Sequence, residues 1–251
     1  MHNSPLVTVI CLCYNHAEFV VEALESVLNQ THQNVELIIA DDFSTDNSVE
    51  IIKNWLHFHP EIQYIFNSEN IGNTKTFNSC LALSKGDYII DLAADDVLKL
   101  DCIAKQLKAF AESTYENLGL VYGNAEWITE KGKYIDAYFP TDSDGKVIEK
   151  QSTGDIYLSI LNGKAKLCSV SALTKKTVFE QLNGYDENLA YEDYDLWIRA
   201  SRIFNFDFTD EILISKRVLD NSMYTLLLQK NNTKTRRFNY STFLIMGKVY
   251  T

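Results

Sequence analysis

Residues 6–42 read LVTVICLCYNHAEFVVEALESVLNQTHQNVELIIADD, and this stretch decides the fold. Residues 6–14 are apolar and β-branched without polar alternation, which predicts a strand buried on both faces. Apolar side chains then recur at helical spacing, and Asn15 and Glu18 are placed as a capping box for that helix. A second buried strand over residues 35–40 ends in two aspartates. The stretch therefore predicts a β-α-β unit.

The same alternation continues along the chain. The next expected elements are a helix capped by Ser44 or Thr45, a strand over residues 62–67, a helix over 74–83, a strand over 88–92 and a helix near 101–110. Strands that alternate with helices predict an α/β fold with a mostly parallel sheet flanked by helices. In such sheets ligands bind outside the carboxyl ends of the strands.

From residue 118 onward the predicted elements are shorter. They are a turn near 141–145, helices near 155–161 and 177–182, a strand over 169–174 and a helix that starts near Asp193. We see no linker that would separate independent domains. We therefore expect one domain over residues 1–222, with halves 1–117 and 118–222, followed by a helical C-terminal tail over 223–251.

Composition excludes several classes of protein. The chain has 251 residues, 46% of them hydrophobic, and a net charge of −11, which argues against nucleic acid as a general partner. No apolar run approaches the roughly 18 residues that cross a bilayer, and the polar N-terminus lacks the pattern of a signal peptide. The five cysteines have no metal-binding spacing. We expect a cytoplasmic protein, either free or at the inner face of the membrane.

The tail differs in charge from the rest of the chain. After Asp220 there is no acidic residue, while five cations give the tail a charge of +5 against −16 for the preceding body. This asymmetry predicts that the tail contacts another copy of the chain or an anionic membrane surface. The alternative is a helix that packs back on its own domain.

Acidic pairs lie at predicted strand and helix ends. Asp95 and Asp96 follow one strand and could hold Mg²⁺ or Mn²⁺, or could simply form a turn. The pair Asp41-Asp42 follows another strand and has the same alternative as an Asx turn. The Glu192-Asp193 pair starts a helix, where an acid serves either as a general base or only as a cap.

Seven motifs together resemble the family 2 glycosyltransferases with a GT-A fold, over residues 6 to about 222. They are, in chain order, residues 9–15 (VICLCYN), 22–30 (EALESVLNQ), 38–46 (IIADDFSTD), 70–72 (NIG), 85–88 (KGDY), 94–96 (ADD) and 184–197 (GYDENLAYEDYDLW). The resemblance implies a Rossmann-like GT-A fold whose first half binds a nucleotide-sugar donor, usually a UDP-sugar. The second half would be a smaller acceptor-side region.

The resemblance also implies roles for residues of the first half. Tyr14 would pack on the uracil and Asp41 would accept its N3 hydrogen, as an aromatic face and one acceptor suit a flat heterocycle. The neighbouring donor-binding residues would be Asn15, Asp42, Asn70, Gly72, Asp95 and Arg217.

Catalysis would follow the family's inverting transfer. Asp193, with Glu192 beside it, would take the proton of the acceptor hydroxyl, which attacks the anomeric carbon. Mn²⁺ or Mg²⁺ held by Asp95 and Asp96 would neutralise the diphosphate. The family's first metal-binding aspartate is replaced by Ala93 here, and a late histidine by Leu219.

The sequence thus predicts an inverting hexosyl- or N-acetylhexosaminyltransferase in surface polysaccharide or protein-glycan synthesis. Its acceptor would be a glycan, glycolipid or glycoprotein. A non-enzymatic alternative, motivated by Ala93 and Leu219, is a transferase-like subunit that binds without turnover. A nucleotidyltransferase is a third alternative, but no Gly-rich phosphate loop follows the first strand.

Overall fold

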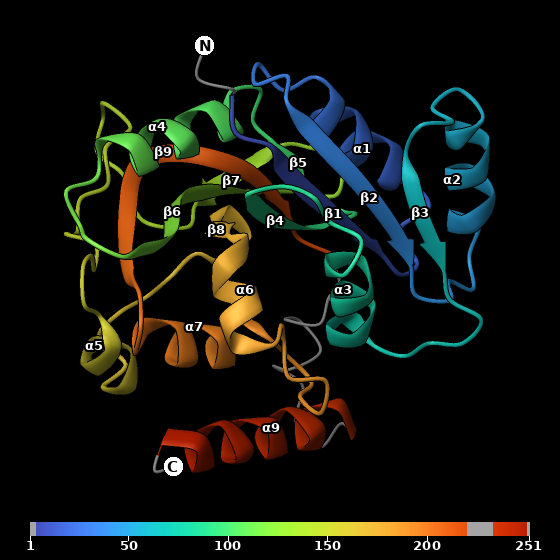
Figure 1. Cartoon of the computed structure of the whole chain (residues 1–251). Coiled ribbons are helices and arrows are strands. Elements are labelled where there is room, and N and C mark those ends of the chain that lie inside the picture. Colours follow the sequence, from blue (N-terminus) through green and yellow to red (C-terminus); the bar gives the residue numbers. More distant parts are fainter. Residues whose placement is uncertain (1–3, 220–232, 250–251) are drawn as a thin grey trace.

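A computed structural model of the chain describes residues 4–219 and 233–249 (Figure 1). In chain order the elements are β1 (Val7–Cys13), α1 (Val20–Leu28), β2 (Val35–Asp41), α2 (Ser48–Leu56), β3 (Gln63–Phe66), α3 (Asn73–Leu81), β4 (Tyr88–Ala93), β5 (Val97–Leu98), α4 (Cys102–Glu112), β6 (Leu118–Ile128), β7 (Tyr134–Ala137), α5 (Tyr157–Leu161), the 3₁₀ turn η1 (Ser169–Ser171), β8 (Leu173–Lys175), α6 (Lys176–Leu182), α7 (Asp193–Ser201), β9 (Asn205–Arg217) and α9 (Thr233–Val249).

One sheet runs through both predicted halves of the domain. The strand order is β3-β2-β1-β4-β8-β6-β9-β5, and β7 pairs with β6. The first four strands are parallel, whereas the β8 to β5 side mixes parallel and antiparallel pairs. The α/β class is confirmed. Because β8 joins β4 to β6, the sheet is continuous across both halves.

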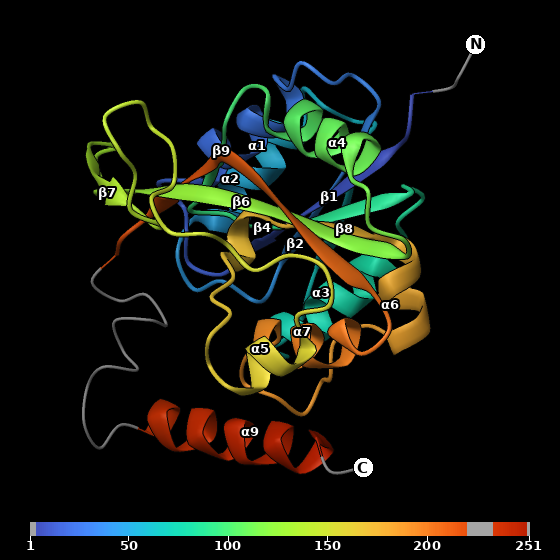
Figure 2. The ribbon, with the colours of Figure 1, turned by 90° about the vertical axis from the view of Figure 1, so that its left-hand side faces the viewer.

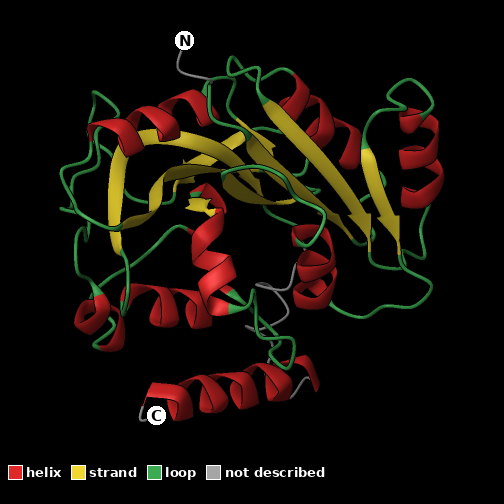
Figure 3. Cartoon of the chain, in the orientation of Figure 1, coloured by secondary structure: helices red, strands yellow, loops and turns green. Residues whose placement is uncertain are grey.

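Helices cover both faces of the parallel strands, as the unbroken apolar pattern of β1 predicted (Figure 3). Val9 and Cys11 lie in the core under α1, α2 and α4, while Ile10 packs on the opposite face with Phe77 of α3 and Phe179 of α6. Successive side chains of a strand point to opposite faces, so each face of β1 is buried by a different helical layer.

The predicted helix caps are wrong. Asn15 adopts a left-handed conformation five residues before α1 begins, and its side chain bonds to Thr45 rather than to the helix. Ser44 and Thr45 lie in the loop before α2, where the Ser44 hydroxyl donates to Asp41. These side chains fasten two loops to each other, a contact between distant segments that local spacing does not reveal.

The second half contains longer strands than the sequence indicated. β6 and β9 have 11 and 13 residues and pair in parallel with three register shifts. β6 begins with eight consecutive buried residues, and β9 shows no regular alternation of buried and exposed residues, so neither strand has the period-2 pattern that predicts a strand. The region predicted as a strand over 169–174 is η1 followed by the short β8.

The predicted boundary at residue 222 lies outside the described residues. Helix α9 forms a separate layer below α5 and α7 in both views (Figures 1 and 2). None of the helices in residues 4–219 and 233–249 combines the length and hydropathy that a bilayer crossing requires.

Candidate active site

The carboxyl ends of β1, β2 and β4 meet at one edge of the sheet. Cys13 at the end of β1 is in register with Asp41 of β2, and Leu12 is in register with Ala93 of β4. The loops that follow these strands therefore start side by side. They carry most of the predicted donor-binding and metal-binding residues.

Two exposed aromatic rings stand on the loops after β1 and β2. Asn15 and Phe43 have positive φ values of 59° and 66°. The Asn15 N–H donates to Ser44 Oγ at 2.8 Å, and Asn15 Oδ1 accepts the Thr45 N–H at 2.7 Å, so the two loops hold each other. The rings of Tyr14 and Phe43 remain 45% and 48% exposed. Sequence reasoning found Tyr14 but missed Phe43, because no local pattern marks a phenylalanine in the left-handed region.

Asp41 lies beneath this surface. Its side chain is fully buried, and its carboxylate accepts the Ser44 N–H at 2.8 Å and the Ser44 hydroxyl at 2.5 Å. A direct contact with a nucleobase requires this loop to open. In the structure, Asp41 therefore fixes the loop that carries Phe43.

Asp42 holds the loop between β3 and α3 in place. Its buried carboxylate accepts the N–H groups of Ile71 and Gly72, both at 2.9 Å, and the Thr76 hydroxyl at 3.1 Å. The Asn70 side chain donates to the Asp42 carbonyl at 3.1 Å. Gly72 has a φ of 92°, which side chains rarely permit. The structure thus brings Asn70 and Gly72 to Asp42, which is their buried anchor. That this loop borders a nucleotide stays a prediction.

Asp95 is the acidic side chain best placed to hold a cation. It is 12% exposed, and its Oδ1 lies 3.5 Å from Nδ1 of His16. Among the described residues that Nδ1 is buried without a hydrogen-bond partner. One carboxylate and one imidazole nitrogen are suitable ligands for Mn²⁺. His16 was not predicted, because it lies 79 positions away and has no metal-binding spacing.

A preformed cage is absent from the described residues, where no three His, Cys, Asp or Glu side chains gather as metal ligands. A cage is not required, since Mg²⁺ commonly keeps waters and shares one or two carboxylates with substrate phosphates. The residues present therefore fit a divalent cation that enters with a nucleotide.

Asp96 points elsewhere. It is 2% exposed, and its Oδ1 accepts the backbone N–H of Arg217 at 2.9 Å. Burial raises the pKa of Asp96 to about 7; Lys216 opposes this rise, and the neighbouring Asp95 adds to it. In the structure, Asp96 anchors the end of β9 and is not exposed for a ligand.

The Arg217 guanidinium is also occupied. It donates to Glu22 at 2.6 Å, to the Asp95 carbonyl at 3.0 Å and to the Glu130 carbonyl at 2.7 Å. It is 4% exposed and lies over the Phe19 ring. Arg217 can contact a diphosphate only if these interactions break, so its predicted role has no support in this geometry.

Three carboxylates converge where α7 begins. Glu192 accepts a hydrogen bond from the Asn73 side chain, and Asp91 of β4 accepts one from the Tyr185 hydroxyl at 3.1 Å. Burial raises the pKa of Glu192 to about 8, and the charges of Asp193 and Asp91 add to this effect. Burial also raises the pKa of Asp91 to about 7, although the Tyr185 hydrogen bond opposes it. The sequence did not assign Asp91 to the site.

Asp193 has a different environment within this cluster. Burial raises its pKa too, but the Tyr194 N–H at 2.7 Å, the charge of Lys216 and the Ser169 hydroxyl oppose the rise. For Glu192, the neighbouring charges of Asp193 and Asp91 instead add to the rise of the pKa. Paired groups whose surroundings separate their pKa values take different roles. Of the two, Asp193 is therefore the member whose surroundings favour the ionised form, and Glu192 the member whose surroundings favour the protonated form.

Glu192→Gln should flatten the pH dependence of stability. The folded chain keeps a proton on Glu192 up to about pH 8, whereas the group in an unfolded chain releases it near its ordinary value of 4.5. The free energy of unfolding should therefore fall as pH rises through this window. In urea titrations at pH 5 and pH 8, we expect the wild type to lose on the order of 2 kcal/mol more than Glu192→Gln.

The exposed Glu69, in the loop before α3, provides the control. Glu69→Gln should leave the wild-type pH dependence intact. If Glu192→Gln behaves like this control, the folded state does not hold the proton on Glu192.

Helix α9 packs against the segment that leads to Glu192. Ile245 is fully buried, and Ser241 Oγ accepts the Ala190 N–H at 2.8 Å. The rings of Phe238 and Tyr191 stack at 4.2 Å. The structure therefore shows the alternative in which the tail packs back on its own domain. Contact with another copy or with a membrane stays a prediction.

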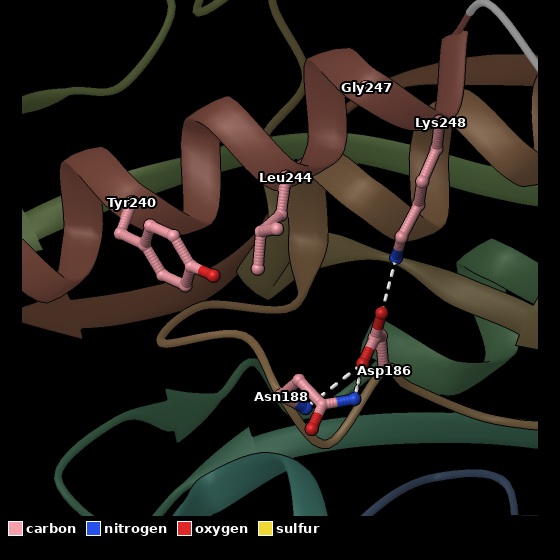
Figure 4. Close-up of a pocket in the computed structure, with 6 residues that line it drawn as sticks. All are labelled: Asp186, Asn188, Tyr240, Leu244, Gly247 and Lys248. Carbon is pink, nitrogen blue, oxygen red and sulfur yellow. Dashed lines mark hydrogen bonds and ion pairs between the residues drawn. The ribbon is translucent and has the colours of Figure 1, made fainter.

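An open groove lies between α9 and the turn after Gly184. Figure 4 shows Tyr240 and Leu244 pointing from α9 toward Asp186 and Asn188, with Lys248 above the turn. Lys248 Nζ lies 2.5 Å from Asp186 and also pairs with the buried Asp195 of α7.

A family model described as "Glycosyl transferase family 2" matches residues 8–182 of the chain. An uncharacterized glycosyltransferase of Rickettsia prowazekii is 30% identical over 86% of the chain and 64% of its own length. The chondroitin synthase of Escherichia coli is 28% identical over 91% of the chain and 31% of its own length. The chain spans 30–65% of the length of the first four curated relatives that it matches.

Solved structures show the same fold at low sequence identity. TarS of S. aureus in complex with UDP superposes with a TM-score of 0.62 at 15% identity, over 94% of this chain and 70% of that one. The mannosyltransferase PcManGT of Pyrobaculum calidifontis, in complex with GDP-Man and Mn²⁺, gives 0.63 at 16% identity, over 97% and 70%.

Proposed function

The chain belongs to glycosyl transferase family 2, and we propose that it transfers a sugar, with inversion, from a UDP-sugar to an acceptor hydroxyl. The observation that carries this proposal is the carboxylate pair at the start of α7. Asp193 stands there with a cation and a hydroxyl that favour its ionised form, beside a Glu192 that favours the protonated form. A general base needs this environment in order to accept a proton at neutral pH.

The nucleotide is assigned to the edge formed by β1 and β2. The exposed rings of Tyr14 and Phe43 offer apolar faces for a flat base, and Asn70 and Gly72 border them through their bonds to Asp42. Asp41 contributes by holding the Phe43 loop. UDP as the nucleotide rests on the family resemblance and on the UDP bound by TarS.

A divalent cation is assigned to Asp95 and His16. Its support is the unpartnered Nδ1 of His16 beside the Asp95 carboxylate, together with the Mn²⁺ in PcManGT. Such an ion supplies charge neutralisation at the diphosphate when it is bound.

The chain's own residues provide the rest of the reaction. Asp193 takes the proton from the acceptor hydroxyl while that oxygen forms a bond to the anomeric carbon. The bond from this carbon to the diphosphate breaks, and its electron pair leaves with UDP. Attack from the face opposite the diphosphate inverts the anomeric centre. Asn73 and Tyr185 hold Glu192 and Asp91 in fixed positions during this step.

The transferred sugar is proposed to be a hexose or N-acetylhexosamine. The acceptor is proposed to be a glycan, glycolipid or glycoprotein in surface polysaccharide or protein-glycan synthesis. The chondroitin synthase among the relatives supports the polysaccharide assignment. A binding subunit without turnover, motivated by Ala93, is the competing function.

Release of UDP from a panel of UDP-sugars tests the proposal. With Mn²⁺ and water as the acceptor, we expect slow hydrolysis of at least one donor. A chain that binds UDP but releases none from any donor, even with a panel of acceptor sugars, would be the binding subunit instead.

A further inference from the structure

β9 carries a second cation, Lys216, next to Arg217. Lys216 is the penultimate residue of this strand and is in register with Trp127 of β6. Because successive side chains of a strand alternate, Lys216 and Arg217 point to opposite faces. Arg217 points into the protein, where Glu22 and backbone carbonyls use its N–H groups.

The Lys216 ammonium is not paired in this way. Among the described residues, no carboxylate lies within 4.0 Å of the Lys216 ammonium, and the ammonium makes no hydrogen bond. Lys216 Nζ lies 5.7 Å from the centroid of the Trp127 ring. The side chain is only partly buried. Partial burial of an unpaired ammonium is unfavourable unless an anion arrives.

Lys216 also lies beside the turn that carries Asp95. The backbone N–H of Arg217, the next residue, donates to Asp96 Oδ1 at 2.9 Å, and Ser215, the preceding residue, is in register with Val97. The charge of Lys216 acts on Asp96, which adjoins the proposed cation ligand Asp95, and on Asp193, the proposed base. In the proposed reaction the diphosphate lies between the cation at Asp95 and the sugar that is attacked with the help of Asp193. The Lys216 charge acts on groups at both ends of this interval.

We propose that Lys216 is the cation that binds the diphosphate of the donor, in the place that the family resemblance gave to Arg217. The assignment rests on the proposed function. A positive ammonium at this position stabilises the negative charge of the bound diphosphate. It also stabilises the additional negative charge that develops on the diphosphate as its bond to the sugar breaks. Lys216 is partly exposed and can make this contact without breaking an ion pair to any described residue.

A series of ligands with none, one or two phosphates separates the contribution of the diphosphate to binding from that of the nucleoside. Calorimetry would measure the affinities of uridine, UMP and UDP, in EDTA and in Mn²⁺, for the wild type, Lys216→Met and Lys216→Arg. We expect Lys216→Met to weaken UDP binding by about tenfold or more and to leave uridine binding within about twofold. Lys216→Arg should restore most of the UDP affinity, because it keeps the charge.

The exposed Lys133, in the loop before β7, supplies the matched control, and Lys133→Met should bind all three ligands as the wild type does. Equal UDP affinity in Lys216→Met and the wild type would overturn the assignment. A uniform loss for uridine and UDP would overturn it as well, since it would indicate a damaged pocket. A wild type that binds none of the three would instead contradict the proposed UDP-sugar function.

Discussion

Asp193→Asn is expected to lower the rate of UDP release by about 10²–10⁴-fold while leaving UDP affinity unchanged. The amide has nearly the shape of the carboxylate and can still accept the Tyr194 N–H at the start of α7. It cannot take a proton from the acceptor, so the loss should appear in turnover rather than in binding. Steady-state kinetics with the best donor of the UDP-sugar panel measures this effect.

A matched variant separates catalysis from helix capping. Glu50 is an exposed acid in the first turn of α2, a helix that carries none of the proposed site residues. Glu50→Gln should retain wild-type turnover. If Asp193→Asn also retains it, Asp193 serves only the helix terminus and the base lies elsewhere.

Asp95→Ala is expected to abolish the effect of Mn²⁺ on UDP binding. The Asp95 carboxylate and the unpartnered His16 nitrogen are the described groups that fit a cation, so removal of the carboxylate should leave UDP bound equally in Mn²⁺ and in EDTA. In the wild type we expect Mn²⁺ to tighten UDP binding by about tenfold or more. Calorimetry in the two buffers gives both affinities.

Two further variants sharpen this result. His16→Ala should reduce the Mn²⁺ effect only in part, because the charged ligand, the Asp95 carboxylate, remains. Asp144→Ala, at an exposed position in the turn after Thr141, should respond to Mn²⁺ like the wild type. An Asp95→Ala variant with the full Mn²⁺ effect would remove Asp95 from the cation site.

The sequence predicted the parts of the site that follow single strands. The apolar runs before Tyr14 and before Asp41 marked buried strands, and parallel strands place their carboxyl ends together. The same logic placed Asp95 at this edge. The Glu192-Asp193 pair was recognisable because acids favour the first turn of a helix.

Contacts between distant segments were not predictable in this way. The sequence offered Arg217 as a cation for the diphosphate, but its guanidinium pairs with Glu22, which lies 195 positions away in the chain. The position of Lys216 depends on the pairing of β9 with β6 through shifted registers, which no local sequence pattern predicts. His16 and Phe43 depend on loops whose geometry is fixed by hydrogen bonds rather than by periodicity.

The stereochemistry of donor hydrolysis tests the central claim most directly. Proton NMR can follow the sugar released from a UDP-α-sugar by the wild type, before the free anomers equilibrate. A single displacement assisted by Asp193 predicts that the β-anomer appears first. If the α-anomer appears first, the reaction retains configuration, and the account of Asp193 as the base of an inverting transfer is contradicted.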